Sequence, residues 1–280
     1  MQIRSFRCIL FNKSRALDPY SSGLLFFIVF YGLQRKNLKC PVKELWRPWT
    51  IGLLLVLLPF AALSWGQQYV DPTIGGLFNG TVPIWSFIAG AILLKGVDRF
   101  TWRRAAGITI GLAGLLIFVS PTLSGLQFST SPMALYGCLA LLGMAWSYGI
   151  GNVLTKKIMV DSRAVSLEAN TFHQYLFCTV CLFVISALLE PFPSAGAFSG
   201  KVILSILTAG VFSSAVAFLL MVALIQRWGA TRMASVTYFS PIIAMATDII
   251  FRHRMPHLIE ILGMGLIFIS LWLIQKKVDA

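Results

Sequence analysis

Charged side chains are scarce in this 280-residue chain: they make up 12% of it, with only 10 Asp and Glu against 23 Lys and Arg. Soluble domains carry about 25% charged residues and are about 45–50% apolar, whereas this chain is 57% hydrophobic. These figures exclude a single soluble globule and a disordered chain. No stripe of Lys or Arg follows a continuous helix face, so the net charge of +13 does not indicate a nucleic-acid partner.

Motifs of common catalytic and nucleotide sites are also missing. The chain has no P-loop, no His-Glu-x-x-His and no Gly-x-Ser-x-Gly. Its five cysteines include one Cys-x-x-Cys, Cys178 and Cys181, which lies in an apolar run and is more typical of small apolar filling than of a redox or metal site. One further group has ligand-like spacing but is interrupted by a proline: His253, His257 and Glu260. We therefore predict no metal, no cofactor and no enzymatic activity.

Long apolar runs are what the chain has instead. A bilayer core requires about 20 apolar residues per helix, and flanking Arg or Trp side chains can extend a shorter run. Asp248 is the only charged residue within these runs. The sequence predicts an all-α integral membrane protein with about nine transmembrane helices: Tyr20–Gln34, Trp49–Gly66, Ile74–Leu94, Ala105–Ser120, Pro132–Thr155, Ala169–Leu189, Val202–Ile225, Met233–Phe251 and Ile261–Gln275.

Basic residues are unevenly divided between the two sets of loops that these helices would define. If the loops are numbered alternately, one set holds 16 Lys and Arg and the other holds 7. Because basic loops stay in the cytoplasm, this asymmetry predicts a multi-pass protein of the plasma (inner) membrane with a cytoplasmic C-terminus. The basic segment 1–15 would then lie outside, which is unusual, and no cleavage site for a signal peptide follows.

An internal repeat accounts for that anomaly. A shift of 158 residues places Pro83 on Pro241, and a shift of 156 places Gly107 on Gly263. We therefore predict a first repeat of four helices in residues 16–121 and a second of five helices in residues 132–275. The counterpart of the second repeat's first helix would precede Met1, so we expect that the start is truncated or misassigned, or that the helix was lost. Repeats of five helices lie inverted with respect to one another, as in many secondary transporters.

The stretches that carry this repeat have a family resemblance. They are Ile74–Pro83, Arg103–Gly107, Gly111–Gly114, Ala234–Pro241 and Glu260–Gly263. On these patterns the chain resembles the drug/metabolite transporter superfamily, specifically an EamA-like permease of two five-helix repeats. The resemblance implies transport of small molecules, export as often as import. A Gly-Glu pair usual in that family is replaced here by Gly96-Val97-Asp98 and by His253-Arg254.

Polar and kinked positions recur on the two proline-bearing helices. A proline inside a helix frees a backbone carbonyl, which in lipid must be satisfied by a neighbour or line a cavity. We predict a cavity between the repeats, with close helix packing as the alternative. The candidate residues on these helices are Asn79, Pro83, Trp85, Ser86, Thr237, Tyr238, Pro241 and Asp248. For Asp248, an ion pair with Arg252 is at least as plausible as substrate or proton binding.

Other polar side chains could face the same space. Tyr148 and Asn152 lie one helical turn apart, and Gln67 follows an apolar run. His173 could relay protons or bind a polar substrate, although a hydrogen-bonded interhelical histidine is the more common outcome. Gly107 and Gly111 form a small-xxx-small pair whose expected role is packing within the chain, with a homodimer contact as the weaker alternative.

These observations favour a secondary transporter that moves a small polar or amphipathic metabolite across the lipid bilayer by alternating access. Since no nucleotide-binding motif is present, a proton or substrate gradient would drive it. An intramembrane enzyme using His173 with Asp248 is a second hypothesis, although the two lie near opposite membrane faces. A degenerate, non-transporting copy is a third, motivated by the missing helix and the altered Gly-Glu positions.

Overall fold

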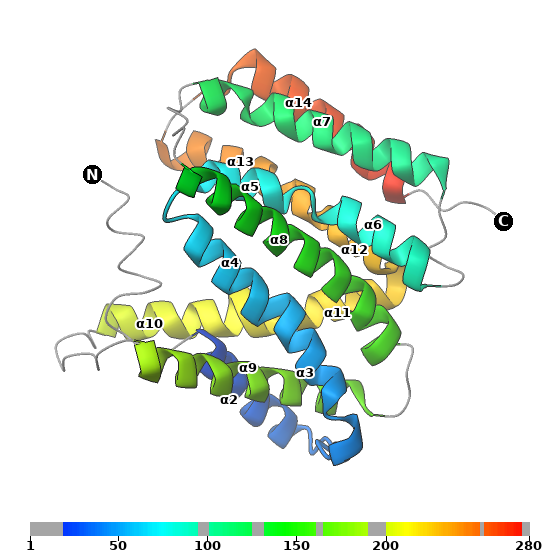
Figure 1. The fold of residues 1–280 in the computed structure, drawn as a ribbon, viewed down its shortest axis with the longest axis vertical. Helices are drawn as coiled ribbons and strands as arrows, with labels where there is room; N and C mark the ends of the chain where they lie inside the picture. The colour runs from blue at the N-terminus through cyan, green and yellow to red at the C-terminus, as the bar shows by residue number, and fades with distance from the viewer. Residues whose placement is uncertain are drawn as a thin grey trace. The chain divides into compact units, whose positions relative to one another are not determined.

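The computed structural model describes residues 19–94, 101–124, 132–160, 165–189, 200–252 and 255–275. Throughout these ranges the regular structure is helical and no strand occurs, which confirms the all-α prediction (Figure 1). The basic segment 1–15 and the Gly96-Val97-Asp98 and His253-Arg254 positions lie outside the described residues.

The chain divides into two compact units, each of which combines early and late segments. The first unit falls within Met1–Leu57 and Ile158–Ala223, and the second comprises Leu58–Lys157 and Leu224–Ala280. Described elements of the first unit are α2 (Pro19–Leu33), η1 (Val42–Glu44), α3 (Trp46–Gly52), η2 (Leu53–Leu57), α9 (Leu167–Leu189), α10 (Gly200–Thr208) and η5 (Ala209–Val216). Helix α11 (Ala217–Trp228) and the π-helical η3 (Thr155–Val160) each contribute residues to both units.

The second unit holds the remaining helices. They are α4 (Leu58–Gly66), α5 (Pro72–Asn79), α6 (Val82–Leu93), α7 (Trp102–Ser124), α8 (Pro132–Leu154), α12 (Ala230–Ala234), η6 (Ser235–Phe239), α13 (Ser240–Arg252) and α14 (Leu258–Gln275). Within this unit α4 and α6 pack on α8, and α7 lies along α14 (Figure 1).

Seven helical stretches in the described part of the chain are long and apolar enough to cross a membrane. They are Val42–Gly66, Pro72–Leu93, Trp102–Pro121, Pro132–Ile158, Ile203–Trp228, Ala230–Phe251 and Leu258–Gln275. Large apolar side chains on these helices stay exposed, among them Ile92 at 74% and Phe251 at 77%, as expected for surfaces that face lipid. Two other expected spans form helices, the shorter apolar α2 and the 23-residue α9. The count of nine stays a prediction.

Both proline-bearing spans are interrupted, which corrects the expectation of prolines in the middle of continuous helices. Helix α5 ends at Asn79 and α6 begins at Val82, while the 3-10 helix η6 leads into α13 at Ser240. Pro83 and Pro241 are therefore each the second residue of a new helix. The first amides of a helix have no intrahelical partner, so a proline costs no helical hydrogen bond there.

An aromatic cluster fills the first unit. The ring of Phe27 on α2 lies 4.7 Å from that of Tyr175 on α9, edge to face, and Tyr175 makes a similar contact with Phe218 on α11 at 5.7 Å. Gly23 allows this approach, because a Cβ there would stand 2.9 Å from Cε1 of Tyr175.

Glycines bring α7 and α14 into backbone contact in the second unit. A Cβ at Gly107 would stand 2.7 Å from Ile274, one at Gly111 would meet the hydroxyl oxygen of Ser270, and one at Gly114 would stand 2.9 Å from the carbonyl oxygen of Gly263. The small-xxx-small pair therefore serves packing within the chain, as expected. Because α14 covers this glycine face, the face is not available to a second copy.

Candidate functional site

The contact between α6 and α8 holds four of the predicted site residues. A Cβ at Gly149 would lie 2.3 Å from Cβ of Trp85, so only glycine permits this approach. Ser86 is fully buried and its hydroxyl donates to the carbonyl oxygen of Gly149 over 3.2 Å. This hydrogen bond joins the two helices, and it places Trp85 beside the turn of α8 that carries Tyr148 and Asn152.

Trp85 and Tyr148 pack against the same apolar cluster. Both pack, partly buried, against the small cluster of Val82, Ala145 and Ala234. The indole Nε1 of Trp85 is buried and has no hydrogen-bond partner among the described residues. A buried donor normally has a hydrogen-bond partner in a folded protein. The Trp85 N–H is therefore a candidate donor to a bound molecule. Asn152, one turn beyond Tyr148, is also buried.

The other candidates on α5, α6 and the end of α4 lie close by in sequence but are not joined to this pair by a described hydrogen bond. Pro83 is buried and Asn79 half-buried. Gln67 packs its amide against Gly75, where a Cβ would stand 3.0 Å from Nε2 of Gln67.

The candidates of the second repeat use their polar groups on backbone atoms. The Thr237 hydroxyl donates to the carbonyl oxygen of Ala234 over 2.9 Å, and the buried Tyr238 hydroxyl donates to that of Ile108 over 3.2 Å. Tyr238 thereby belongs to the core between α7 and α14. Pro241 is half-buried at the start of α13, and the side chain of Asp248, on the same helix, lies outside the described residues.

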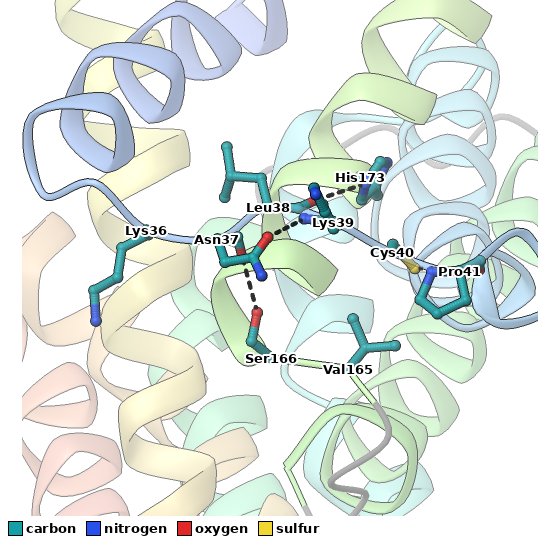
Figure 2. A pocket seen from close by; sticks show the side chains of 9 residues that line it. All are labelled: Lys36, Asn37, Leu38, Lys39, Cys40, Pro41, Val165, Ser166 and His173. Atoms are coloured by element: carbon teal, nitrogen blue, oxygen red, sulfur yellow. Dashed lines mark hydrogen bonds between the residues drawn. The ribbon is translucent and has the colours of Figure 1, made fainter.

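His173 faces the loop between α2 and η1 in the first unit. Its Nε2 lies 3.1 Å from the carbonyl oxygen of Leu38, and because a carbonyl only accepts, this nitrogen carries the proton in that contact (Figure 2). The residue lines an open pocket of about 990 Å³ together with Lys36, Asn37, Lys39 and Ser166. The hydrogen bond gives His173 a positioning role for this loop.

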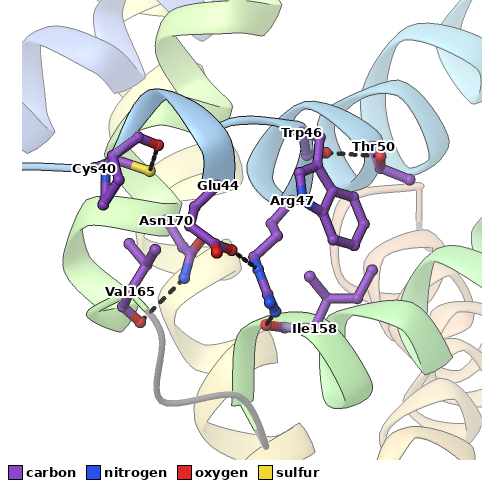
Figure 3. A network of polar contacts seen from close by, with 9 residues as sticks. Cys40, Glu44, Trp46, Arg47, Thr50, Ile158, Val165 and Asn170 are labelled. Carbon is purple, nitrogen blue, oxygen red and sulfur yellow. Dashed lines mark hydrogen bonds and ion pairs between the residues drawn. The ribbon is translucent and has the colours of Figure 1, made fainter.

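Charged pairs hold the same end of the first unit together. Lys36 Nζ lies 2.9 Å from Oε1 of Glu168, and this hydrogen bond lowers the pKa of that carboxyl. Arg47 pairs with Glu44 and donates to the carbonyl oxygen of Ile158 over 3.4 Å (Figure 3). Cys40 lies nearby, and burial raises the pKa of its thiol.

His257 and Glu260, two of the three residues with ligand-like spacing, have a structural role at the start of α14. Glu260 is buried, and its Oε2 accepts a hydrogen bond from the backbone N–H of His257 over 2.8 Å. This is the carboxylate half of a capping box, which satisfies an amide at the helix N-terminus. His253 lies outside the described residues.

Sequence reasoning did not select Asn170 and Gln174, the most deeply buried amide side chains of α9, at 1% and 0% exposure. Their spacing of four residues within an apolar stretch was the available signal.

Comparison with known proteins identifies the family of this chain. The model of the EamA-like transporter family matches residues 19–120 and 135–275, which is most of the chain. The chain belongs to the EamA-like transporter family. It is a multi-pass membrane transporter, and the two matched regions agree with the two repeats expected of that family.

Relatives in bacteria are named as transporters. The uncharacterized transporter YvbV of Bacillus subtilis is 28% identical over 95% of this chain and 87% of its own length. YoaV of the same organism, also named an uncharacterized transporter, is 27% identical over 79% of this chain and 72% of its own. The probable amino-acid metabolite efflux pump of Escherichia coli is 23% identical over 79% and 74%. A solved crystal structure matches 93% of this chain and 86% of its own with a TM-score of 0.74 at 17% identity, which shows the shared fold.

Proposed function

We propose that this EamA-like transporter is a secondary exporter of small amino-acid-related metabolites that works by alternating access between two inverted repeats. The repeats are residues 16–121, with four helices, and residues 132–275, with five. Proton coupling or substrate exchange supplies the driving force. The protein lies in the plasma membrane with its C-terminus in the cytoplasm, because the basic loops lie on that side.

The observation that carries this proposal is the pair of interrupted helices at repeat-related positions. The break between α5 and α6 and the break at η6 before α13 fall at corresponding points, each with a proline as the second residue of the new helix. Discontinuous helices of this kind line the substrate sites of many secondary transporters, where unwound backbone is tolerated only beside a cavity or inside protein.

Trp85 and Tyr148 are the proposed substrate-binding residues beside the first break. Each presents an apolar ring and a polar end, and the Trp85 N–H has no described partner. Such a pair suits a metabolite that has an apolar body and a hydrogen-bond acceptor. The name of the Escherichia coli relative supports amino-acid metabolites as the class to test first.

Flux through proteoliposomes tests the proposal. Vesicles holding the full chain are loaded with labelled amino acids, their N-acetyl derivatives and their N-acetyl amides, with and without a pH gradient. We expect release of at least one solute above protein-free vesicles, faster with the gradient if protons are coupled. Trp85→Phe should lower this flux about tenfold, since it removes one hydrogen bond to the substrate and little volume.

Reporter fusions after Lys157 and after Ser194 test the topology on which the proposal depends. We expect the two reporters on opposite sides of the membrane. Two reporters in one compartment would contradict the inverted repeats, and the absence of flux for every solute would favour a degenerate, non-transporting copy.

A further inference from the structure

Two carboxamides of α9 are buried without the hydrogen bonds they need. Gln174 is 0% exposed, and neither its Nε2 nor its Oε1 has a partner among the described residues. Asn170, one turn earlier and 1% exposed, donates from Nδ2 to the carbonyl oxygen of Val165 over 3.3 Å, while its Oδ1 has no partner (Figure 3). Unsatisfied groups of this kind are rare inside proteins.

Helix α3 packs on α9 at Gly52, where a Cβ would stand 2.8 Å from Sγ of Cys178 and 3.4 Å from Cγ of Gln174. The Cγ of Gln174 therefore lies in this contact, and the atoms nearest to Gly52 belong to side chains and not to the backbone. We call this contact, formed by Gly52, Gln174 and Cys178, the α3–α9 seam.

The surroundings of the amides define the chemistry of a ligand. Buried side chains of the first unit, such as Phe27, Ile51 and Tyr175, are apolar or aromatic, and no described residue of the seam is charged. A charged group would be expensive in this place without a counter-ion. An uncharged group that both donates and accepts, such as an amide, could satisfy both atoms of the Gln174 carboxamide at once.

We infer that the α3–α9 seam opens to bind the uncharged, hydrogen-bonding group of a transported solute, with Gln174 as its main partner and the Oδ1 of Asn170 as a second acceptor. The inference rests on the proposed transport function. It adds a binding site in the first unit and a preference for amides over the corresponding acids.

Binding to Gln174→Met tests the inference independently of flux. Methionine has nearly the length of glutamine and no hydrogen-bonding amide. Without ligand, we expect the unfolding midpoint of purified Gln174→Met to be about 3 °C above that of the wild type, because an unsatisfied buried amide is gone. With N-acetylleucinamide, the wild-type midpoint should rise with ligand concentration, and that of Gln174→Met should not. N-acetylleucine, the matching acid, should shift neither protein.

Thr171→Val is the matched control on the same turn of α9. Thr171 is buried, but its hydroxyl already donates to the carbonyl oxygen of Leu167 over 2.8 Å. This variant should lower the midpoint, since it also removes a hydrogen bond between Thr171 and Tyr31, and it should keep the N-acetylleucinamide shift. A retained shift in Gln174→Met, a lower midpoint without ligand, or equal shifts with the amide and the acid would each overturn the inference. Failure of wild-type flux alone would instead count against the proposed function, since the binding readout does not depend on transport.

Discussion

Glycine lies against backbone atoms in the α7–α14 contact and against side-chain atoms in the α3–α9 seam. At Gly263 of α14, an added Cβ would stand 2.5 Å from the backbone nitrogen of Phe118 and 2.7 Å from the carbonyl oxygen of Gly114, atoms that cannot move alone. At Gly52 of α3, the nearest atoms belong to the side chains of Cys178, Phe177 and Gln174. The first contact is made between two backbones, whereas the second is made against side chains, and we expect it to part more easily.

The largest effect is expected at the fixed contact. Gly263→Ala should destabilise the protein by about 3 kcal/mol or more, because the two helices must separate along their axes to admit one methyl group. Folded yield and unfolding midpoint in detergent would measure this. Gly265→Ala, on the same helix with nothing within 4 Å of the added Cβ, is the control and should be neutral or stabilising by about 0.5–1 kcal/mol. Equal stability of the two variants would show that the α7–α14 contact is not as tightly fixed as we infer.

A smaller effect is expected in the seam. Gly52→Ala should cost about 1 kcal/mol, since the Cys178 and Gln174 side chains can move away from the new methyl group. Flux should fall more than this loss of stability suggests, because the methyl group occupies the space that a ligand would enter. Gly32→Ala, with nothing within 4 Å, is the reference for both measurements. A loss of stability as large as that of Gly263→Ala would show that the seam is as rigid as the α7–α14 contact.

The smallest effect concerns the ion pair at the end of α9 and depends on pH. The Lys36 hydrogen bond lowers the pKa of Glu168 below its ordinary value of 4.5, so the folded state holds this proton less tightly than the unfolded state. The resulting stability is present above the unfolded-state pKa and is lost as pH falls through the lowered value. Glu168→Gln should remove a few tenths of a kcal/mol at pH 7, since the pair is partly exposed, and its effect should become smaller as the pH falls below 4.5. Thermal midpoints of both proteins from pH 7 to pH 3, with Glu44→Gln as a comparison, would check it; a difference that does not shrink as the pH falls would contradict the assignment.

The proline-bearing spans show which features the sequence predicted and which it did not. The shift of 158 residues correctly paired Pro83 with Pro241, and both residues do occupy the same position in a helix. The sequence did not reveal that each span is broken just before its proline. Hydropathy is continuous across Gly80 and Thr81, and only the contacts of neighbouring helices decide whether a glycine-threonine step continues a helix or ends it.

The buried polar side chains also fall into two groups that the sequence did not distinguish. Polar residues in apolar runs were found by composition, but Tyr238 and Thr237 use their hydroxyls on backbone carbonyls, while the Trp85 N–H and the Gln174 amide have no described partner. Spacing along one helix cannot distinguish these cases, because the partner of a buried polar group usually comes from another helix.

Composition and the long apolar runs established that this chain is a helical membrane protein, since so few charges cannot cover a water-facing surface and a helix satisfies its own backbone hydrogen bonds in lipid. The order of prolines and glycines established the repeat and the family resemblance. Which glycines meet backbone and which meet side chains, and which amides remain without a partner, were decided by the tertiary structure. Those properties depend on atoms brought together from distant parts of the chain, and a one-dimensional pattern does not contain their distances.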